Sequence, residues 1–157
     1  MTTDATARVQ RFFAERGVHV EIQTFDASVH TALQAAQTLA TEVRNIVKSL
    51  VFEADGQPVL VLCSGDRRVD TARLATLCAA QQVRQASAER TRSVTGYSIG
   101  GVPPVAHATP LPIFMDQALL TCEVVYAAAG TARTLFAIAP QTLRDVSGAQ
   151  VVSVSEA

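Results

Sequence analysis

The order of apolar and polar residues along the chain predicts a mixture of helices and strands. Helices are expected where apolar residues recur every three or four positions, and strands where they alternate or form short runs. The predicted helices cover residues 3–16, 32–40, 70–79 and 87–93, and a last one begins at Pro140. The predicted strands cover residues 18–22, 46–53, 58–63, 83–86, 111–115, 123–128, 134–139 and 151–154, with a helical turn at Leu119 and Leu120.

The clearest local signal is Asp55-Gly56 between the strands 46–53 and 58–63, which predicts a two-residue hairpin. Elsewhere strands and helices alternate irregularly. This pattern favours an α/β fold with a mixed, partly antiparallel sheet and surrounding helices over a regular doubly wound sheet. No repeat, low-complexity tract or linker interrupts the chain, so we expect a single domain over residues 1–157.

Several helix details can be predicted from capping and periodicity. Thr3 or Asp4 can cap the first helix, and Asp70 the third. The apolar residues expected to face the core are Leu33, Ala36 and Leu39 in the second helix and Leu74 and Leu77 in the third.

Composition narrows the functional classes. Apolar residues make up 48% and charged residues 17% of the 157 residues, which is typical of a globular chain. A net charge of −1 argues against a protein that coats nucleic acid, although a local arginine patch could hold a phosphate backbone. Aromatic residues are 5% and Trp is absent, which argues against a platform for stacking many bases.

The termini and the cysteines indicate a cytoplasmic protein without a resident metal. No apolar run is long enough to span a membrane, and the first residues lack a signal-peptide pattern. Cys63, Cys78 and Cys122 are widely spaced and form no CxxC pair, so neither a zinc site nor a disulfide framework is expected. We interpret them as buried thiols, and we expect no cofactor.

Lys48 is the only lysine, and it interrupts the apolar run 46–52. Strand alternation puts Lys48 on one face with Ile46, Leu50 and Phe52, and Ser49 on the other with Val47 and Val51. A cation among apolar neighbours costs several kcal/mol, roughly, unless it is paired or opens into a cleft. Two interpretations stay open: a lysine that reaches water along its own stem, and a lysine at the floor of a site for an anion or a carbonyl oxygen.

The second unusual stretch is the Gly- and Pro-rich loop 95–110, which contains Gly100, Gly101, Pro104 and His107. Glycines followed by prolines can hold backbone N–H groups in a fixed concave arrangement that grips a carbonyl oxygen or phosphate. A tight connection without a ligand would have the same composition. The spacing excludes the common nucleotide-binding loops, and Ser98 lacks the GxSxG context of a hydrolase nucleophile.

Together these segments resemble the YbaK / prolyl-tRNA synthetase-associated domain family. The residues that carry the resemblance are the lysine strand 46–52 (IVKSLVF) and the later segment 100–107 (GGVPPVAH), whose Gly100 and Pro104 form a GxxxP pattern. Further similar stretches are residues 30–36, 64–70, 111–116 and 129–130, so that the resemblance covers roughly residues 18–152. Two positions differ from the family pattern: Gln117 replaces an acidic residue and Ser49 a more common threonine.

The resemblance implies an aminoacyl-tRNA deacylase that hydrolyses the ester between a wrong amino acid and the terminal adenosine of a tRNA. Lys48 would position the adenosine or the ester through charge-assisted hydrogen bonds. The backbone N–H groups of Gly100 and Gly101 would hold the carbonyl, His107 would orient the ribose or a water, and groups of the substrate itself would assist. The other residues expected to bind substrate are Ser49, Pro104, Asp116 and Gly130.

The expected partners are the 3′ end of a mischarged tRNA, for example tRNA for proline carrying alanine, cysteine or a similar small residue, and an aminoacyl-tRNA synthetase. Neither a membrane nor DNA is expected. One alternative is a non-catalytic module of the same fold that binds a tRNA end, a nucleotide or a synthetase. Another is a structural partner of a translation complex. The deacylase and the non-catalytic binding module both require Lys48 and the Gly-Pro loop to face one pocket, and the structural partner does not.

Overall fold

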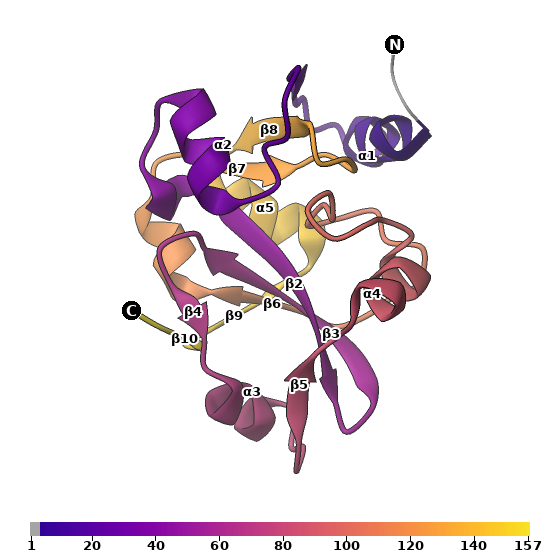
Figure 1. Cartoon of the computed structure of the whole chain (residues 1–157), viewed down its shortest axis with the longest axis vertical. Helices are drawn as coiled ribbons and strands as arrows, with labels where there is room; N and C mark the ends of the chain where they lie inside the picture. The colour runs from indigo at the N-terminus through magenta and orange to yellow at the C-terminus, as the bar shows by residue number, and fades with distance from the viewer. Residues whose placement is uncertain (1–3) are drawn as a thin grey trace.

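The computed structural model describes residues 4–157. Five α-helices and two short 3-10 helices connect or cover the strands (Figure 1): α1 (Asp4–Glu15), α2 (Ala32–Leu39), η1 (Val43–Asn45), α3 (Thr71–Leu77), α4 (Ala88–Thr95), η2 (Gln117–Thr121) and α5 (Pro140–Ser147). The strands are β1 (Ile22–Thr24), β2 (Val47–Ala54), β3 (Gln57–Ser64), β4 (Arg68–Val69), β5 (Val83–Gln85), β6 (Ile113–Asp116), β7 (Val125–Ala128), β8 (Thr134–Ile138), β9 (Gln150–Val152) and β10 (Ser155–Glu156).

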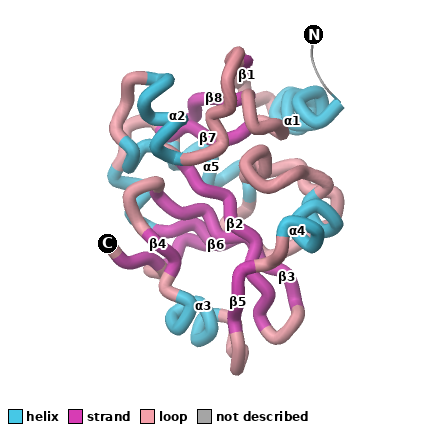
Figure 2. The backbone as a smooth tube through the Cα atoms, viewed as in Figure 1, coloured by secondary structure: helices cyan, strands magenta, loops and turns pink. Residues whose placement is uncertain are grey.

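A five-stranded mixed sheet forms the centre of the molecule (Figure 2). Its order is β5-β2-β3-β6-β9, antiparallel from β5 to β3 and parallel from β3 to β9. A second, antiparallel sheet has the order β1-β8-β7, and β4 pairs with β10. The predicted fold class, a mixed and partly antiparallel sheet with surrounding helices, is confirmed.

The β2–β3 hairpin forms as the sequence predicts. Ala54 pairs with Gln57 across the two-residue turn. Both turn residues have positive φ, 48° at Asp55 and 82° at Gly56, as a type I′ turn requires. This turn fixes the register of the two strands and places Lys48 directly opposite Cys63.

Strand β2 separates two apolar clusters, as its alternation predicts. Val47 and Val51 pack into the main cluster, which includes Phe13 of α1. Phe52 packs on the other face of the sheet, in the cluster that contains Leu74 of α3. A third, smaller cluster joins Ala35 and Ala36 of α2 to Ile46, which directly precedes β2, and to Leu135 of β8.

Some details of the sequence prediction are wrong. Leu33 is 57% exposed and Leu77 is 41% exposed, because these short helices bury only Ala35 and Ala36 in α2 and Leu74 in α3. The strand expected over 18–22 begins only at Ile22, where its partner β8 begins to pair with it. Helix α1 begins at Asp4, and the alternative cap Thr3 lies outside the described residues.

One edge of β2 is open along part of its length, and this opening positions the candidate site. On that side β5 pairs only with residues 52–54 of β2. Tyr126 of β7 forms one isolated bridge with Ile46, the residue before β2. Within residues 4–157, no strand therefore pairs with this edge along Val47–Leu50. An unpaired edge presents backbone N–H and C=O groups that a ligand can use.

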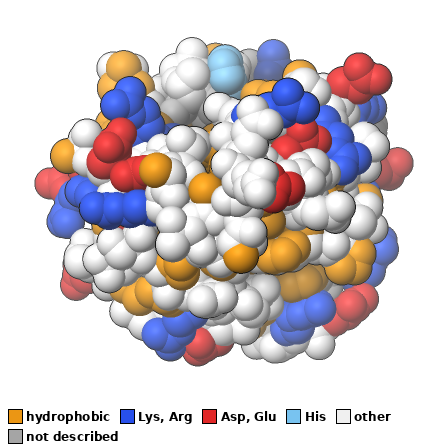
Figure 3. All heavy atoms as spheres, turned by 90° about the horizontal axis from the view of Figure 1, so that it is seen from below, with side chains coloured by type: hydrophobic (Ala, Val, Ile, Leu, Met, Phe, Trp, Pro, Cys, Tyr) orange, Lys and Arg blue, Asp and Glu red, His pale blue; other side chains and the backbone are white. Residues whose placement is uncertain are grey.

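The surface seen from below carries basic and acidic side chains interspersed with apolar ones (Figure 3). No single-sign field extends over this face, in agreement with the net charge of −1. Among the described helices, none is both long and apolar enough to cross a membrane.

Candidate active site

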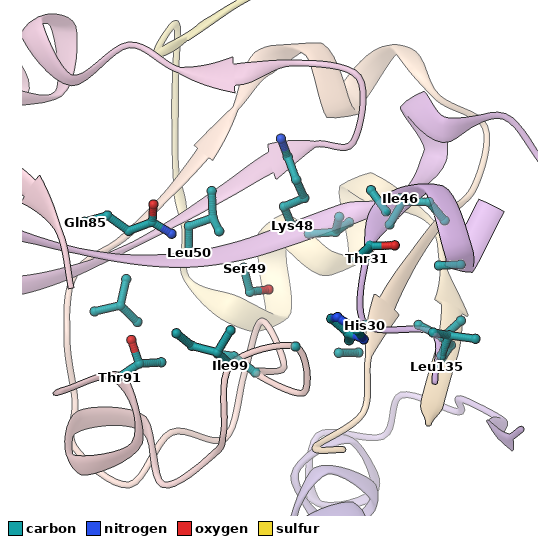
Figure 4. A pocket seen from close by; sticks show the side chains of 18 residues that line it. His30, Thr31, Ile46, Lys48, Ser49, Leu50, Gln85, Thr91, Ile99 and Leu135 are labelled. Carbon is teal, nitrogen blue, oxygen red and sulfur yellow. The ribbon is translucent and has the colours of Figure 1, made fainter. Parts of the chain in front are cut away.

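A cavity of about 320 Å³ lies along the open edge of β2. Four parts of the fold enclose it: residues 29–32 with Ala35 at the start of α2, residues 47–51 of β2, the loop residues Ile99, Gly100 and Val102, and Leu135 of β8 with Ala128 of β7. Gln85 and Thr91 complete its wall. Because β2 runs through it edge-on, side chains from both faces of the strand contribute (Figure 4).

Lys48 lines this cavity, and its ammonium group is held on one side of β2. Figure 4 shows Lys48 and Leu50 on the same side of the ribbon, away from Ser49. The Nζ atom donates a hydrogen bond to the backbone carbonyl of Arg67 in the turn after β3. An ammonium has three N–H donors, so two remain for other partners. The lysine therefore has a fixed anchor while it keeps donors that a substrate can use.

Ser49 lies on the other side of the strand, where it faces Ile99 and His30 (Figure 4). Its Oγ atom is buried, and none of the residues from 4 to 157 offers it a hydrogen-bond partner. An unsatisfied buried hydroxyl is costly, so such a group points to a partner outside the chain. The position of Ser49 in the cavity wall makes a ligand group the natural partner.

Gly100 closes the cavity against His30. Its φ is +91°, and an added Cβ would lie 2.6 Å from the Cβ of His30, so only glycine fits here. His30 itself is held by a hydrogen bond between its Nδ1 and the hydroxyl of Ser28. Within residues 4–157 no backbone carbonyl accepts a hydrogen bond from the Gly100 N–H, which leaves this group able to donate to a substrate oxygen.

Gly101 does not share this position. Its N–H donates to the carbonyl of Ser98 at 2.9 Å, so the group is already used. A Cβ at Gly101 would lie 2.8 Å from the Cα of Thr131, which shows that the glycine permits close backbone packing. Gly101 is not among the cavity residues. The expected pair of N–H donors is therefore reduced to Gly100 in this structure.

Pro104 and His107 also lie outside the cavity. Pro104 is buried, and the Nε2–H of His107 donates to the carbonyl of Pro103 at 2.7 Å. Burial lowers the pKa of His107 below its ordinary value of 6.5, with the bond to Pro103 acting in the opposite sense. In this position the ring braces its own loop, and the expected contact of His107 with a ribose or a water stays a prediction.

Asp116 and Gly130 have structural surroundings as well. Asp116 is 2% exposed, and its carboxylate accepts hydrogen bonds from the backbone of Ala118 and Val154 and from the hydroxyl of Ser155. Gly130 has a φ of +107°, and a Cβ there would lie 2.9 Å from the backbone of Ala5 in α1. Neither residue lines the cavity, and their contact with substrate stays a prediction.

Cys63 lies beside the lysine but is not suited to nucleophilic chemistry. The side chain is fully buried directly opposite Lys48. Burial raises its pKa to about 11, against the lowering effect of Lys48, so the thiol is protonated at neutral pH. No group of three or more His, Cys, Asp or Glu residues in the described chain is arranged to hold a metal ion.

Several cavity residues have no role predicted from the sequence, chiefly His30, Thr31, Gln85 and Ile99. Only the hydrogen-bonded cap of α2 gives a local signal, since Thr31 accepts from the Gln34 N–H in a capping box. The other residues reach the cavity because distant segments converge on the open edge of β2, which no local pattern reveals.

Comparison with known proteins identifies the class to which this fold and site belong. The model of the aminoacyl-tRNA editing domain matches residues 26–146, and the chain belongs to this family. A solved structure of a protein proposed to be a trans-editing enzyme for prolyl tRNA synthetase has a TM-score of 0.93 and 42% identity, with 100% of both chains covered.

Two kinds of curated relative match. YwhH, an uncharacterised protein of Bacillus subtilis, is 27% identical over 144 residues, which are 91% of each chain. The proline–tRNA ligase of Maridesulfovibrio salexigens is 35% identical over 92 residues, 59% of this chain and 16% of the ligase. That of Bacillus licheniformis is 36% identical over 107 residues, 68% of this chain and 18% of the ligase. The chain thus spans less than a fifth of the ligases that it matches.

Proposed function

We propose that this protein is a trans-editing aminoacyl-tRNA deacylase, which hydrolyses the ester between a small, wrongly attached amino acid and the 3′-terminal ribose of a tRNA. The observation that carries the proposal is the cavity that Lys48, Ser49 and Gly100 share at the open edge of β2. Membership of the aminoacyl-tRNA editing domain family supports the reaction class.

The proposed chemistry relies on positioning and needs no nucleophilic side chain. Attack of water on the ester carbonyl develops negative charge on the carbonyl oxygen, which preorganised N–H donors stabilise. We assign this task to the Gly100 N–H, and we assign to the free donors of Lys48 the positioning of the substrate at the edge of β2. Water adds to the carbonyl carbon, the ester C–O bond breaks, and the ribose oxygen takes up a proton as the free amino acid leaves.

Cavity size supports a small aminoacyl group. A volume of about 320 Å³ is at the lower end of the range for ligand pockets, roughly 300–1,000 Å³. Much of the wall is apolar, from Val47, Val102 and Leu135. One methylene group changes discrimination by about 10–200-fold in such a pocket, so alanine and cysteine are the substrates we propose first. The tRNA that we propose is that for proline, with a prolyl-tRNA synthetase as partner in the cytoplasm.

A deacylation screen tests this function. Purified protein is mixed with tRNA for proline that carries alanine, cysteine, serine or proline, and the ester remaining is measured over time. We expect hydrolysis of at least one small wrong aminoacyl group and none of prolyl-tRNA. Tight binding of the tRNA 3′ end without hydrolysis of any of these esters would refute the proposal and favour a binding module of the same fold.

A further inference from the structure

The ammonium of Lys48 is connected through hydrogen bonds to the last strand of the chain. Its acceptor is the carbonyl of Arg67, a residue in the turn that joins β3 to β4. The Arg67 N–H in turn donates to the carbonyl of Ser64 at 3.0 Å, which closes that turn. The position of the lysine anchor therefore depends on how firmly Arg67 is held.

The side chain of Arg67 is held by β10. Its Nε donates to the hydroxyl of Ser155 at 2.5 Å, and its Nη2 donates to the carbonyl of Ser155 at 3.3 Å. Two donors of one planar guanidinium thus bind one residue, which fixes orientation as well as distance. Residue 155 lies beyond the segment 26–146 that the family model matches, so this contact joins Arg67 inside that segment to a strand outside it.

Ser155 is itself fixed by a buried carboxylate. Its hydroxyl donates to Asp116 Oδ2 at 2.8 Å, and the neighbouring Val154 N–H donates to Asp116 Oδ1 at 2.9 Å. Ser155 is 3% exposed and Asp116 2% exposed. Low exposure strengthens these bonds and raises the cost of leaving any of their groups without a partner.

We propose that Arg67 and Ser155 are positioning residues for Lys48, so that β10 forms part of the active site although it does not line the cavity. This inference rests on the proposed deacylase function for its kinetic consequences. The path runs from Asp116 through the Ser155 hydroxyl and the Arg67 guanidinium to the Arg67 carbonyl, which orients the ammonium toward the substrate ester. The path also gives Asp116 a role in the site without contact to the substrate.

The test uses Ser155→Ala and its conservative counterpart Ser155→Thr, which keeps the hydroxyl. Glu156→Gln is the matched control, because Glu156 pairs with Arg68 on the surface of the same strand at 3.2 Å and is not linked to Lys48. We expect Ser155→Ala to lower kcat for deacylation on the order of 10–100-fold, as misplacement of a catalytic group does. KM should stay within about twofold, Ser155→Thr should restore most of kcat, and Glu156→Gln should match the wild type.

A second readout does not depend on activity. Lys48 is the only lysine, so protein labelled with ¹³C-lysine gives a single Cε signal in NMR spectra. Ser155→Ala should change the chemical shift and the line width of this signal relative to wild type, while Glu156→Gln should leave both unchanged. An Arg67→Met variant, which removes the guanidinium and keeps the carbonyl, should cause the same change, and the double variant should add little to either single one.

The outcomes are distinguishable. A Lys48 signal that is unaffected by both Ser155→Ala and Arg67→Met, in variants that remain folded, overturns the positioning role. An altered signal in a protein that hydrolyses no mischarged tRNA leaves the link to Lys48 intact and refutes the proposed function instead. A loss of kcat that Glu156→Gln reproduces would show a general effect of β10 on the fold and also overturn the proposal.

Discussion

The contact between Gly100 and His30 should be sensitive to a single methyl group. In Gly100→Ala, the added Cβ would lie 2.6 Å from the His30 Cβ, closer than real Cβ atoms approach one another. The backbone at +91° is also strained for any side chain, at a cost of about 1–2 kcal/mol. Moving the segments of Gly100 and His30 apart adds the typical cost of overpacking, about 1–3 kcal/mol. The free energy of unfolding should therefore fall by about 2–5 kcal/mol.

Gly56→Ala is the matched control. Gly56 has a similar φ of +82°, but nothing lies within 4 Å of an added Cβ. This variant should therefore lose only the backbone term, about 1–2 kcal/mol. For a chain of this size each kcal/mol lowers Tm by about 2–4 °C, so thermal melts by circular dichroism should resolve the difference between the two variants.

Activity should separate the two glycines more clearly. Because Gly100 lines the cavity and Gly56 lies in the distant hairpin turn, Gly100→Ala should lower deacylation on the order of 10²-fold while Gly56→Ala keeps it. Equal melting temperatures and equal rates for the two variants would refute the reasoning, since the loop would then not close against His30.

Three other predictions concern Cys63, His107 and the effect of a chelator. Cys63→Ala should keep the deacylation rate within about twofold, because the buried thiol, whose pKa is raised to about 11, is protonated at neutral pH; loss of the rate in a folded variant would indicate a thiol mechanism. The pKa of His107 in the folded protein is below its ordinary 6.5, so its contribution to stability is present above that pH and is lost as the pH falls below it. Between pH 7.5 and pH 5 the free energy of unfolding, measured with urea, should therefore fall less in His107→Gln than in the wild type. A chelator should leave the rate unchanged, because the described residues offer no metal-ligand cluster, and recovery of a lost rate by added zinc would contradict this.

Local patterns predicted much of the fold. The Asp55-Gly56 turn and the alternation of β2 are local features, so the hairpin, its register and the two faces of the strand follow from the sequence. The exposed positions of Leu33 and Leu77 were not predicted, because helix periodicity shows which residues share a face but not which face finds a partner. The two-residue strands β4 and β10 form only through long-range pairing and leave no local signal.

The shared cavity was predicted from the sequence, while the roles of the site residues stay predictions. Lys48, Ser49 and Gly100 line one cavity, as expected from an isolated lysine and a glycine-rich loop. Gly101 and His107 were predicted as site residues because they belong to the same motif as Gly100, but both donate hydrogen bonds to carbonyl groups of their own loop. Motif spacing cannot show which N–H of a loop is already used, because that depends on the turn the loop adopts.

The most direct test of the central claim is single-turnover hydrolysis of mischarged tRNA by Lys48→Ala, with thermal melts on the same samples. If Lys48 positions the ester, the rate should fall on the order of 10²–10³-fold, the usual cost of losing one donor that stabilises the transition state. The melting temperature should change little, because the half-buried lysine contributes one hydrogen bond to the fold. A folded Lys48→Ala protein that hydrolyses the ester at the wild-type rate would contradict the account.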